Sequence, residues 1–166
     1  MSADKRPVSI LAVIHDPQLQ VLLLERAAHP GYWQSVTGSL EADETPAAAA
    51  LREIGEETGL SINPEDLRDW RLSNRFEIFA HWRHRYAAGV SHNTEHVFSV
   101  CVAAGCSVRV APDEHRRARW LPWRQAAAEC FSWSNRDAIL MLGLAGQGRA
   151  ATAQQTSPPA CLSTRE

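Results

Sequence analysis

Closely spaced cysteine pairs and long hydrophobic runs are both missing from this sequence. The four cysteines, Cys101, Cys106, Cys130 and Cys161, form no C-x-x-C pair, and no signal-peptide pattern precedes them. We therefore interpret them as free thiols in a reducing compartment and expect a cytoplasmic protein. The longest apolar runs are far shorter than the ~20 residues that a transmembrane helix needs, so no membrane role is predicted.

An excess of basic residues is missing as well. The chain has 17 Lys and Arg against 19 Asp and Glu, which gives a net charge of −2. A protein that binds nucleic-acid polymers through their phosphates is expected to be basic, so such a partner is not predicted. The 166 residues, 45% of them hydrophobic, are typical of one globular domain. We place this domain at residues 1–145, because residues 146–166 lack periodicity and predict a disordered tail.

Apolar patterns along the chain predict a mixture of strands and helices. Two apolar runs at 8–14 and 20–24, separated by a turn that contains Pro17, predict a hairpin. Further extended segments are expected at 32–37, 75–80, 95–103 and 118–121, and helices at 123–130 and 134–144. This order favours an α/β (α+β) layered domain, which by itself leaves the function open.

The segment from Gly38 to Leu60 predicts a loop, a short helix and a second loop. Thr45 can cap the free amides at the helix start, and Pro46 at the first helical position loses no hydrogen bond. Gly59 supplies the left-handed residue that ends the helix. At about 100° per residue one apolar face is expected to pack on a core. Its members are Ala47, Ala50, Leu51, Ile54 and Thr58.

Three glutamates, Glu53, Glu56 and Glu57, share an arc beside this apolar face. Carboxylates at such spacing repel one another by a few tenths of a kcal/mol per pair, and a bound cation reverses that penalty. Oxygen ligands on one face suit Mg²⁺, which shares its coordination sphere with phosphates. Arg52 lies one turn before Glu56 and could hold that carboxylate in place. The alternative is a solvated acidic helix face.

The same segment fits the pattern G-x5-E-x7-R-E-U-x-E-E-x-G-U, in which U is a bulky aliphatic residue. The fixed positions are Gly38, Glu44, Arg52, Glu53, Ile54, Glu56, Glu57, Gly59 and Leu60. Through this complete Nudix box, residues 7–143 resemble the Nudix hydrolases. The resemblance implies an α/β/α sandwich with a mixed β-sheet. It also implies hydrolysis of a nucleoside diphosphate linked to another group, with Mg²⁺ as cofactor and Mn²⁺ as a substitute.

Five segments outside the box resemble the bacterial branch of this family that acts in folate biosynthesis. They are KRPVSIL at 5–11, WQSVTGS at 33–39, FEIFAHWRHRYAAGV at 76–90, NTE at 93–95 and SWSNR at 132–136. This resemblance implies that dihydroneopterin triphosphate and water give dihydroneopterin monophosphate and pyrophosphate. A small-molecule triphosphate is thus the expected partner, and the oligomeric state is open.

The resemblance also implies roles for individual residues. The metal ligands would be Glu53, Glu57 and Glu114, and the catalytic group would add Glu56 and Arg52. The general base is open among Glu114, Glu56 and Glu57, and Glu114 has the alternative of a solvated turn residue. The substrate-binding residues would be Lys5, Arg26, Thr37, Phe76, Glu77, Ile78, Phe79 and Ser132.

These substrate contacts are chemically reasonable, and each has a simpler alternative. Lys5 and Arg26 can bind triphosphate oxygens, and an aromatic ring can cover the flat face of a pterin. A surface Lys or Arg is more often solvated, and Phe76 and Phe79 are more often core residues. Two other functions stay open: hydrolysis of ordinary or oxidised nucleoside triphosphates, and a Nudix-fold binding module without catalysis.

Overall fold

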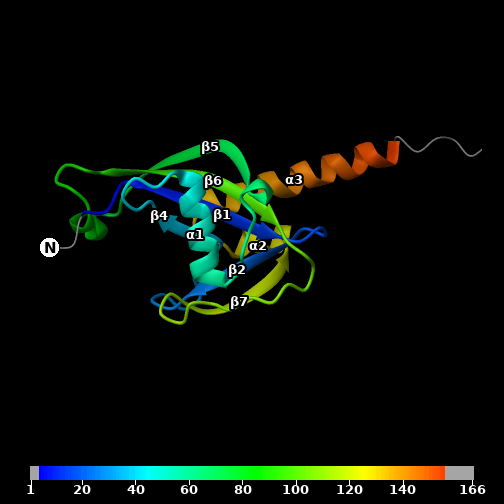
Figure 1. Ribbon diagram of the computed structural model, residues 1–166, viewed down its shortest axis with the longest axis horizontal. Coiled ribbons are helices and arrows are strands. Elements are labelled where there is room, and N and C mark those ends of the chain that lie inside the picture. The colour runs from blue at the N-terminus through cyan, green and yellow to red at the C-terminus, as the bar shows by residue number, and fades with distance from the viewer. Residues whose placement is uncertain (1–3, 156–166) are drawn as a thin grey trace, which may run out of the picture.

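A seven-stranded mixed sheet forms the centre of the protein, and helices cover both of its faces (Figure 1). The computed structural model describes residues 4–155. The strands are β1 (Val8–His15), β2 (Gln20–Arg26), β3 (Trp33–Gln34), β4 (Val36–Ser39), β5 (Arg68–Glu77), β6 (His92–Cys101) and β7 (His115–Pro122). The helices are α1 (Pro46–Thr58), α2 (Trp123–Glu129) and α3 (Trp133–Gln155), with short 3₁₀ turns η1 (Pro64–Asp66) and η2 (Ala80–Arg85).

The strand order is β3-β2-β1-β6-β5, with β4 paired to β1 and β7 paired to β2. Strands β1 and β6 are parallel, whereas β1 pairs antiparallel with β2 and with β4. Because successive residues of a strand alternate between faces, β1 supplies two separate cores. Ile10 and Ala12 pack with α1, and Leu11 and Val13 pack with α2 and α3. The predicted α/β/α sandwich with a mixed sheet is confirmed.

Helix α1 has the start and the end that the sequence predicts. The Thr45 hydroxyl accepts a hydrogen bond from the Ala48 amide at 3.2 Å, and Gly59 adopts φ +72°. The predicted apolar face is partly wrong, because Ala47 is exposed and Ala49 is buried in its place. With this rotation Glu53 and Glu57 join the buried side of the helix, while Glu56 stays exposed. Two of the three glutamates are therefore held against the sheet.

The strand predicted at 75–80 is wrong in its position. Strand β5 occupies Arg68–Glu77, and its pairing with β6 shifts between Asp69 and Ser73 beside Arg71, which has φ +51°. Strand β5 is an edge strand whose side chains are mostly exposed, so its sequence contains no apolar run from which a strand could be predicted. Because β5 ends at Glu77, Ile78 and Phe79 lie beyond the end of the strand.

Helix α3 is longer than the sequence predicts. It runs from Trp133 to Gln155, and its last part extends away from the sheet in Figure 1. The expected disordered tail therefore begins with a helical stretch, and residues 156–166 lie outside the described residues. No described helix is long and apolar enough to span a membrane.

Candidate active site

The loop before α1 is fitted closely to the helix through Gly38. A Cβ atom added at this position would overlap the carboxylate of Glu53. Gly38 pairs with Ile10 in the sheet and lies outside the positive-φ region, so sterics alone require glycine here. The glycine of the box thus allows Glu53 to lie directly against strand β4.

Arg52 joins the loop to the helix through four hydrogen-bond partners. Its guanidinium donates two 2.9 Å bonds to the carboxylate of Glu44 and a 3.1 Å bond to the carbonyl of Ser39. The third nitrogen donates to Glu53 at 2.9 Å and to Glu56 at 3.1 Å. Arg52 therefore orients several carboxylates, whereas the sequence predicted a contact with Glu56 alone. Its hydrogen bonds lower the pKa of Glu44, which keeps this pair ionised.

Glu53 lies where an ionised carboxylate is unfavourable without a cation. Burial raises its pKa to about 7, and the negative charges of Glu57 and Glu56 act in the same direction. The hydrogen bond and the charge of Arg52 oppose this shift. A divalent cation between the carboxylates would remove both the repulsion and the cost of burial.

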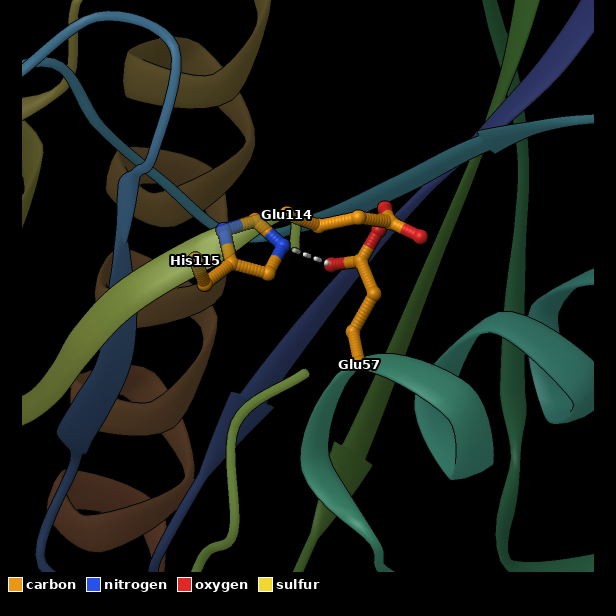
Figure 2. A group of neighbouring side chains, drawn as sticks. All are labelled: Glu57, Glu114 and His115. Carbon is orange, nitrogen blue, oxygen red and sulfur yellow. Dashed lines mark hydrogen bonds and ion pairs between the residues drawn. The ribbon is translucent and has the colours of Figure 1, made fainter. Parts of the chain in front are cut away.

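Glu57 lies between His115 and Glu114 (Figure 2). Its Oε2 atom is 3.0 Å from Nε2 of His115, and both side chains are almost fully buried. Burial raises the pKa of Glu57, while the hydrogen bonds from His115 and from the Thr37 amide lower it. Glu57, Glu114 and His115 each offer one atom that can bind a metal ion, and these three atoms all lie within 4.8 Å of one another. Glu114 is the exposed member of this group.

His115 is a residue that the sequence analysis missed. It begins β7, opposite Arg26, and its amide donates to the Ala111 carbonyl at 2.8 Å. A hydrogen bond to an ionised Glu57 requires a proton on Nε2, and in the neutral tautomer Nδ1 is then an acceptor. This Nδ1 atom is buried and has no partner within residues 4–155. The only signal in the sequence is its position next to Glu114.

The loop that carries Glu114 is tied to the end of β2. The Ala27 amide donates to the Glu114 carbonyl at 2.8 Å, and the Glu114 amide donates to Ala111 at 3.1 Å. This places Glu114 close to Glu57 although 57 residues separate them in the chain. The structure thus brings together two of the three predicted metal ligands, and the third, Glu53, lies one turn before Glu57 on α1.

Lys5 lies beside these carboxylates. Burial and the nearby charge of Arg85 lower the pKa of its ammonium group, while Glu53 and Glu114 raise it. The Lys5 amide donates to the Arg85 carbonyl at 2.9 Å, and a β-bridge joins Lys5 to Tyr86. An exposed cation next to a group of carboxylates can bind phosphate oxygens that enter the same site.

Arg26 and Phe79 lie among aromatic rings that are exposed or half-buried. The Arg26 guanidinium carbon is 5.9 Å from the ring centre of Trp82 and 5.7 Å from that of Phe131. Phe79 is 63% exposed and stacks against His81, so it is a surface residue and not part of the core. Three aromatic side chains therefore lie next to the predicted substrate residues Arg26 and Phe79 or belong to them, and each can stack on a planar ring. They are Phe79, Trp82 and Phe131.

The remaining predicted substrate residues have different surroundings. Thr37 accepts a 3.1 Å hydrogen bond from Gln34, while its amide binds Glu57. Ile78 is buried, and Glu77 is paired with Arg83 outside the carboxylate group. Phe76 is half-buried on β5, and Ser132 is half-buried just before α3. Two of the eight predicted substrate residues interact with the carboxylates. The amide of Thr37 donates a hydrogen bond to Glu57, and the ammonium group of Lys5 is attracted by the charges of Glu53 and Glu114.

These carboxylates fit a divalent cation by their chemistry. Glu53, Glu57 and Glu114 offer oxygen donors, which hard cations prefer. Burial raises the pKa values of Glu53 and Glu57 and the neighbouring carboxylates add to the shift, so a compensating positive charge would be favoured here. His115 binds Glu57 through Nε2, which suits it to orient this carboxylate.

Comparison with known proteins agrees with this arrangement. The NUDIX domain family matches residues 5–142, so the chain belongs to the Nudix family. It is 47% identical over 138 residues to the dihydroneopterin triphosphate diphosphatase of Escherichia coli, covering 81% of this chain and 91% of that protein. The Haemophilus influenzae protein of the same name is 39% identical over 142 residues, covering 84% and 89%.

Solved structures agree at the level of the fold. The structure of the E. coli dihydroneopterin triphosphate pyrophosphohydrolase superposes with a TM-score of 0.77 at 43% identity, covering 86% of this chain and 99% of that one. A Nudix hydrolase from Listeria monocytogenes has a TM-score of 0.73 at 21% identity, covering 87% and 97%. The second match supports the fold alone.

Proposed function

We propose that this protein is a Mg²⁺-dependent pyrophosphohydrolase that converts dihydroneopterin triphosphate and water to dihydroneopterin monophosphate and pyrophosphate. The observation that carries the proposal is the convergence of Glu57 and Glu114 in a Nudix chain. The substrate comes from the relatives, which share 47% and 39% identity over most of both lengths. A cytoplasmic location and a role in folate biosynthesis follow as part of the same proposal.

The reaction breaks one phosphoanhydride bond and adds the elements of water. The bond between the α and β phosphates breaks, the water oxygen becomes bonded to one phosphorus, and a proton leaves the water. When Mg²⁺ is bound, it neutralises phosphate charge and lowers the pKa of a bound water. Glu53, Glu57 and Glu114 would hold the cation, and Mn²⁺ could replace Mg²⁺ at the same oxygen donors.

We assign the acceptance of the water proton to Glu114. Glu56 is hydrogen-bonded to Arg52, and Glu57 accepts hydrogen bonds from His115 and from the Thr37 amide. Glu114 is the exposed member of the group that Figure 2 shows. A base must reach the water that attacks phosphorus, so the exposed carboxylate next to Glu57 suits this role best.

The other residues would bind the substrate or position the carboxylates. Arg52 and Glu44 fix the loop and hold Glu53 against β4. The ammonium group of Lys5 would bind phosphate oxygens beside Glu53 and Glu114, and Arg26 would approach the triphosphate from the end of β2. Phe76 to Phe79 and Ser132 would contact the pterin, since they lie on the segments that resemble the pterin-specific branch.

The proposal is tested by measuring the release of pyrophosphate and of phosphate with Mg²⁺ and with a chelator. Dihydroneopterin triphosphate is compared with ATP, GTP and an oxidised guanosine triphosphate. We expect pyrophosphate to be released fastest from the pterin substrate, and only with the metal. Faster turnover of a nucleotide would overturn the substrate assignment, and absence of turnover on every substrate would favour a binding module.

Matched variants test the carboxylates separately. Glu57→Gln and Glu114→Gln keep the shape of each side chain, and each is expected to lower kcat by about 10²-fold or more. Glu65→Gln, on the exposed turn η1, removes the same charge away from the site and serves as the control. Unchanged turnover in Glu57→Gln, with Mg²⁺ dependence intact, would remove Glu57 from the metal site.

A further inference from the structure

A row of polar side chains crosses the sheet on the face that α3 covers. Ser39 of β4 pairs with Ser9 of β1, Ser9 pairs with Glu95 of β6, and Glu95 pairs with Asn74 of β5. Leu11 and Val97, two residues further along β1 and β6, pack in the core beneath α2 and α3. Because side chains at i and i+2 share a face, Ser9 and Glu95 point to the same side.

Two acceptor atoms in this region are buried without a hydrogen-bond partner. Asn93 is 5% exposed and Glu95 is 6% exposed. Glu95 accepts hydrogen bonds from Ser134 and Asn74, and the Asn93 amide nitrogen donates to the Ser9 hydroxyl at 2.7 Å. Oδ1 of Asn93 and Oε1 of Glu95 have no partner among residues 4–155. Leaving such buried atoms unpaired is unfavourable, so a ligand that supplies donors would be favoured.

The two acceptors lie on the same face of β6, because they are two residues apart. Phe76 pairs with Asn93 across the sheet, and Ser134 follows Ser132 at the start of α3. The row ends at β5, an edge strand on which Asn74 and Phe76 are half-buried. At its other end the backbone carbonyl of Ser39 accepts a 3.1 Å hydrogen bond from Arg52, whose guanidinium also binds Glu44, Glu53 and Glu56.

A ligand that satisfies both atoms needs two donors on the side that faces β6. A 2-amino-4-oxo ring has a ring N–H beside an exocyclic amino group, and both pterin and guanine contain this edge. Adenine offers an amino group beside a ring acceptor, and hypoxanthine offers the ring N–H without the amino group. The acceptor pair would therefore distinguish a pterin or guanine ring from adenine and hypoxanthine by the number and order of hydrogen-bond donors on the ring edge.

We propose that Glu95 and Asn93 are specificity-determining residues that accept hydrogen bonds from the adjacent ring N–H and amino group of a 2-amino-4-oxo ring. This inference rests on the proposed function, because it places the ring of the triphosphate substrate on the α3 face. Burial raises the pKa of Glu95, and two donors at its free oxygen and at Asn93 would favour the ionised carboxylate again.

The test compares GTP with ITP, which differ only in the 2-amino group. We expect kcat/KM for GTP to exceed that for ITP by about 10-fold or more in the wild type, because a hydrogen bond to a charged group is at stake. In Glu95→Gln the amide nitrogen replaces one acceptor, so the ratio is expected to fall close to one. Glu129→Gln removes a half-buried carboxylate that pairs with Arg119, and this control should keep the wild-type ratio.

With dihydroneopterin triphosphate, Glu95→Gln should raise KM by about 10-fold or more and change kcat less. Binding of neopterin monophosphate, followed by pterin fluorescence, should weaken to the same extent without any need for turnover. An unchanged GTP to ITP ratio together with unchanged pterin binding would overturn the inference. Failure of the proposed function gives a different result, namely a wild type that prefers another triphosphate.

A second variant covers the case in which Glu95→Gln does not fold. Asn93→Ala removes one acceptor and leaves Glu95 with its partners Ser134 and Asn74. We expect this variant to lower the GTP to ITP ratio severalfold while its thermal unfolding stays cooperative. A ratio equal to that of the wild type would exclude Asn93 from ring recognition.

Discussion

Gly38→Ala is the substitution whose effect follows most directly from the packing of the site. The added Cβ would lie 1.9 Å from Oε1 of Glu53, so the carboxylate must move by about 1.5 Å to reach an ordinary van der Waals contact. A displacement of that size at a catalytic centre can cost about 10²-fold in rate. Moving Glu53 also strains its 2.9 Å hydrogen bond from Arg52. We therefore expect kcat/KM to fall about 100-fold and the Mg²⁺ concentration for half-maximal rate to rise.

Gly55→Ala is the matched control, since it makes the same chemical change inside α1. The nearest atom to a Cβ at Gly55 is the Leu60 carbonyl oxygen at 3.7 Å, which is an ordinary contact. Alanine favours the helix over glycine, so this variant should be more stable by about 0.5–1 kcal/mol and keep its activity. Steady-state kinetics against Mg²⁺ and thermal unfolding measure both effects. Wild-type kinetics in a folded Gly38→Ala would refute the close fit of Glu53 to β4.

Three further predictions concern the supports of the site. Arg52→Lys loses the two parallel hydrogen bonds to Glu44, so we expect kcat/KM to fall about 10–100-fold. The control is Arg136→Lys, because the guanidinium of Arg136 pairs with Asp137 at the surface. Equal activity of the two variants would contradict the role of Arg52. In chelator, the raised pKa of Glu53 means that the folded state binds more protons than the unfolded state between pH 4.5 and about 7. The Tm should therefore decrease as the pH rises through this range, and Mg²⁺ should restore it above pH 7; a Tm that rises throughout, with no response to Mg²⁺, would oppose the assignment. Asn135→Ala leaves the buried Ser35 amide without its 2.7 Å acceptor, and calorimetry should show a loss of about 1–3 kcal/mol, against little change for Asp137→Ala on the exposed side of α3.

The sequence predicted most of the elements because their local signals agree with the fold. Thr45, Pro46 and Gly59 define the ends of α1, and the apolar runs of β1 and β2 are long enough to identify. Strand β5 was placed wrongly because an exposed edge strand needs no apolar pattern. The long α3 was underpredicted because the Gly and Ala residues after Leu144 carry little periodicity.

The box glutamates were identified from sequence because their spacing along one helix is a local property. Their different environments were not, since only the packing of α1 on β4 and β1 buries Glu53 and Glu57 and leaves Glu56 exposed. His115 was missed because a single histidine gains its role only when the fold places it against a residue 58 positions away. The acceptor pair of Asn93 and Glu95 was missed for the same reason.

The sequence alone determined the family and the helix that carries the carboxylates, and it predicted a divalent cation there, because a motif of fixed spacing on one helix contains that chemistry. The tertiary structure decided which carboxylates are buried, which one is exposed beside Glu57, and which polar atoms are left unpaired beneath α3. These properties depend on side chains that are distant in sequence and meet only when the sheet pairs its strands in register. Burial and electrostatic coupling arise from that assembly, so no local pattern could specify them.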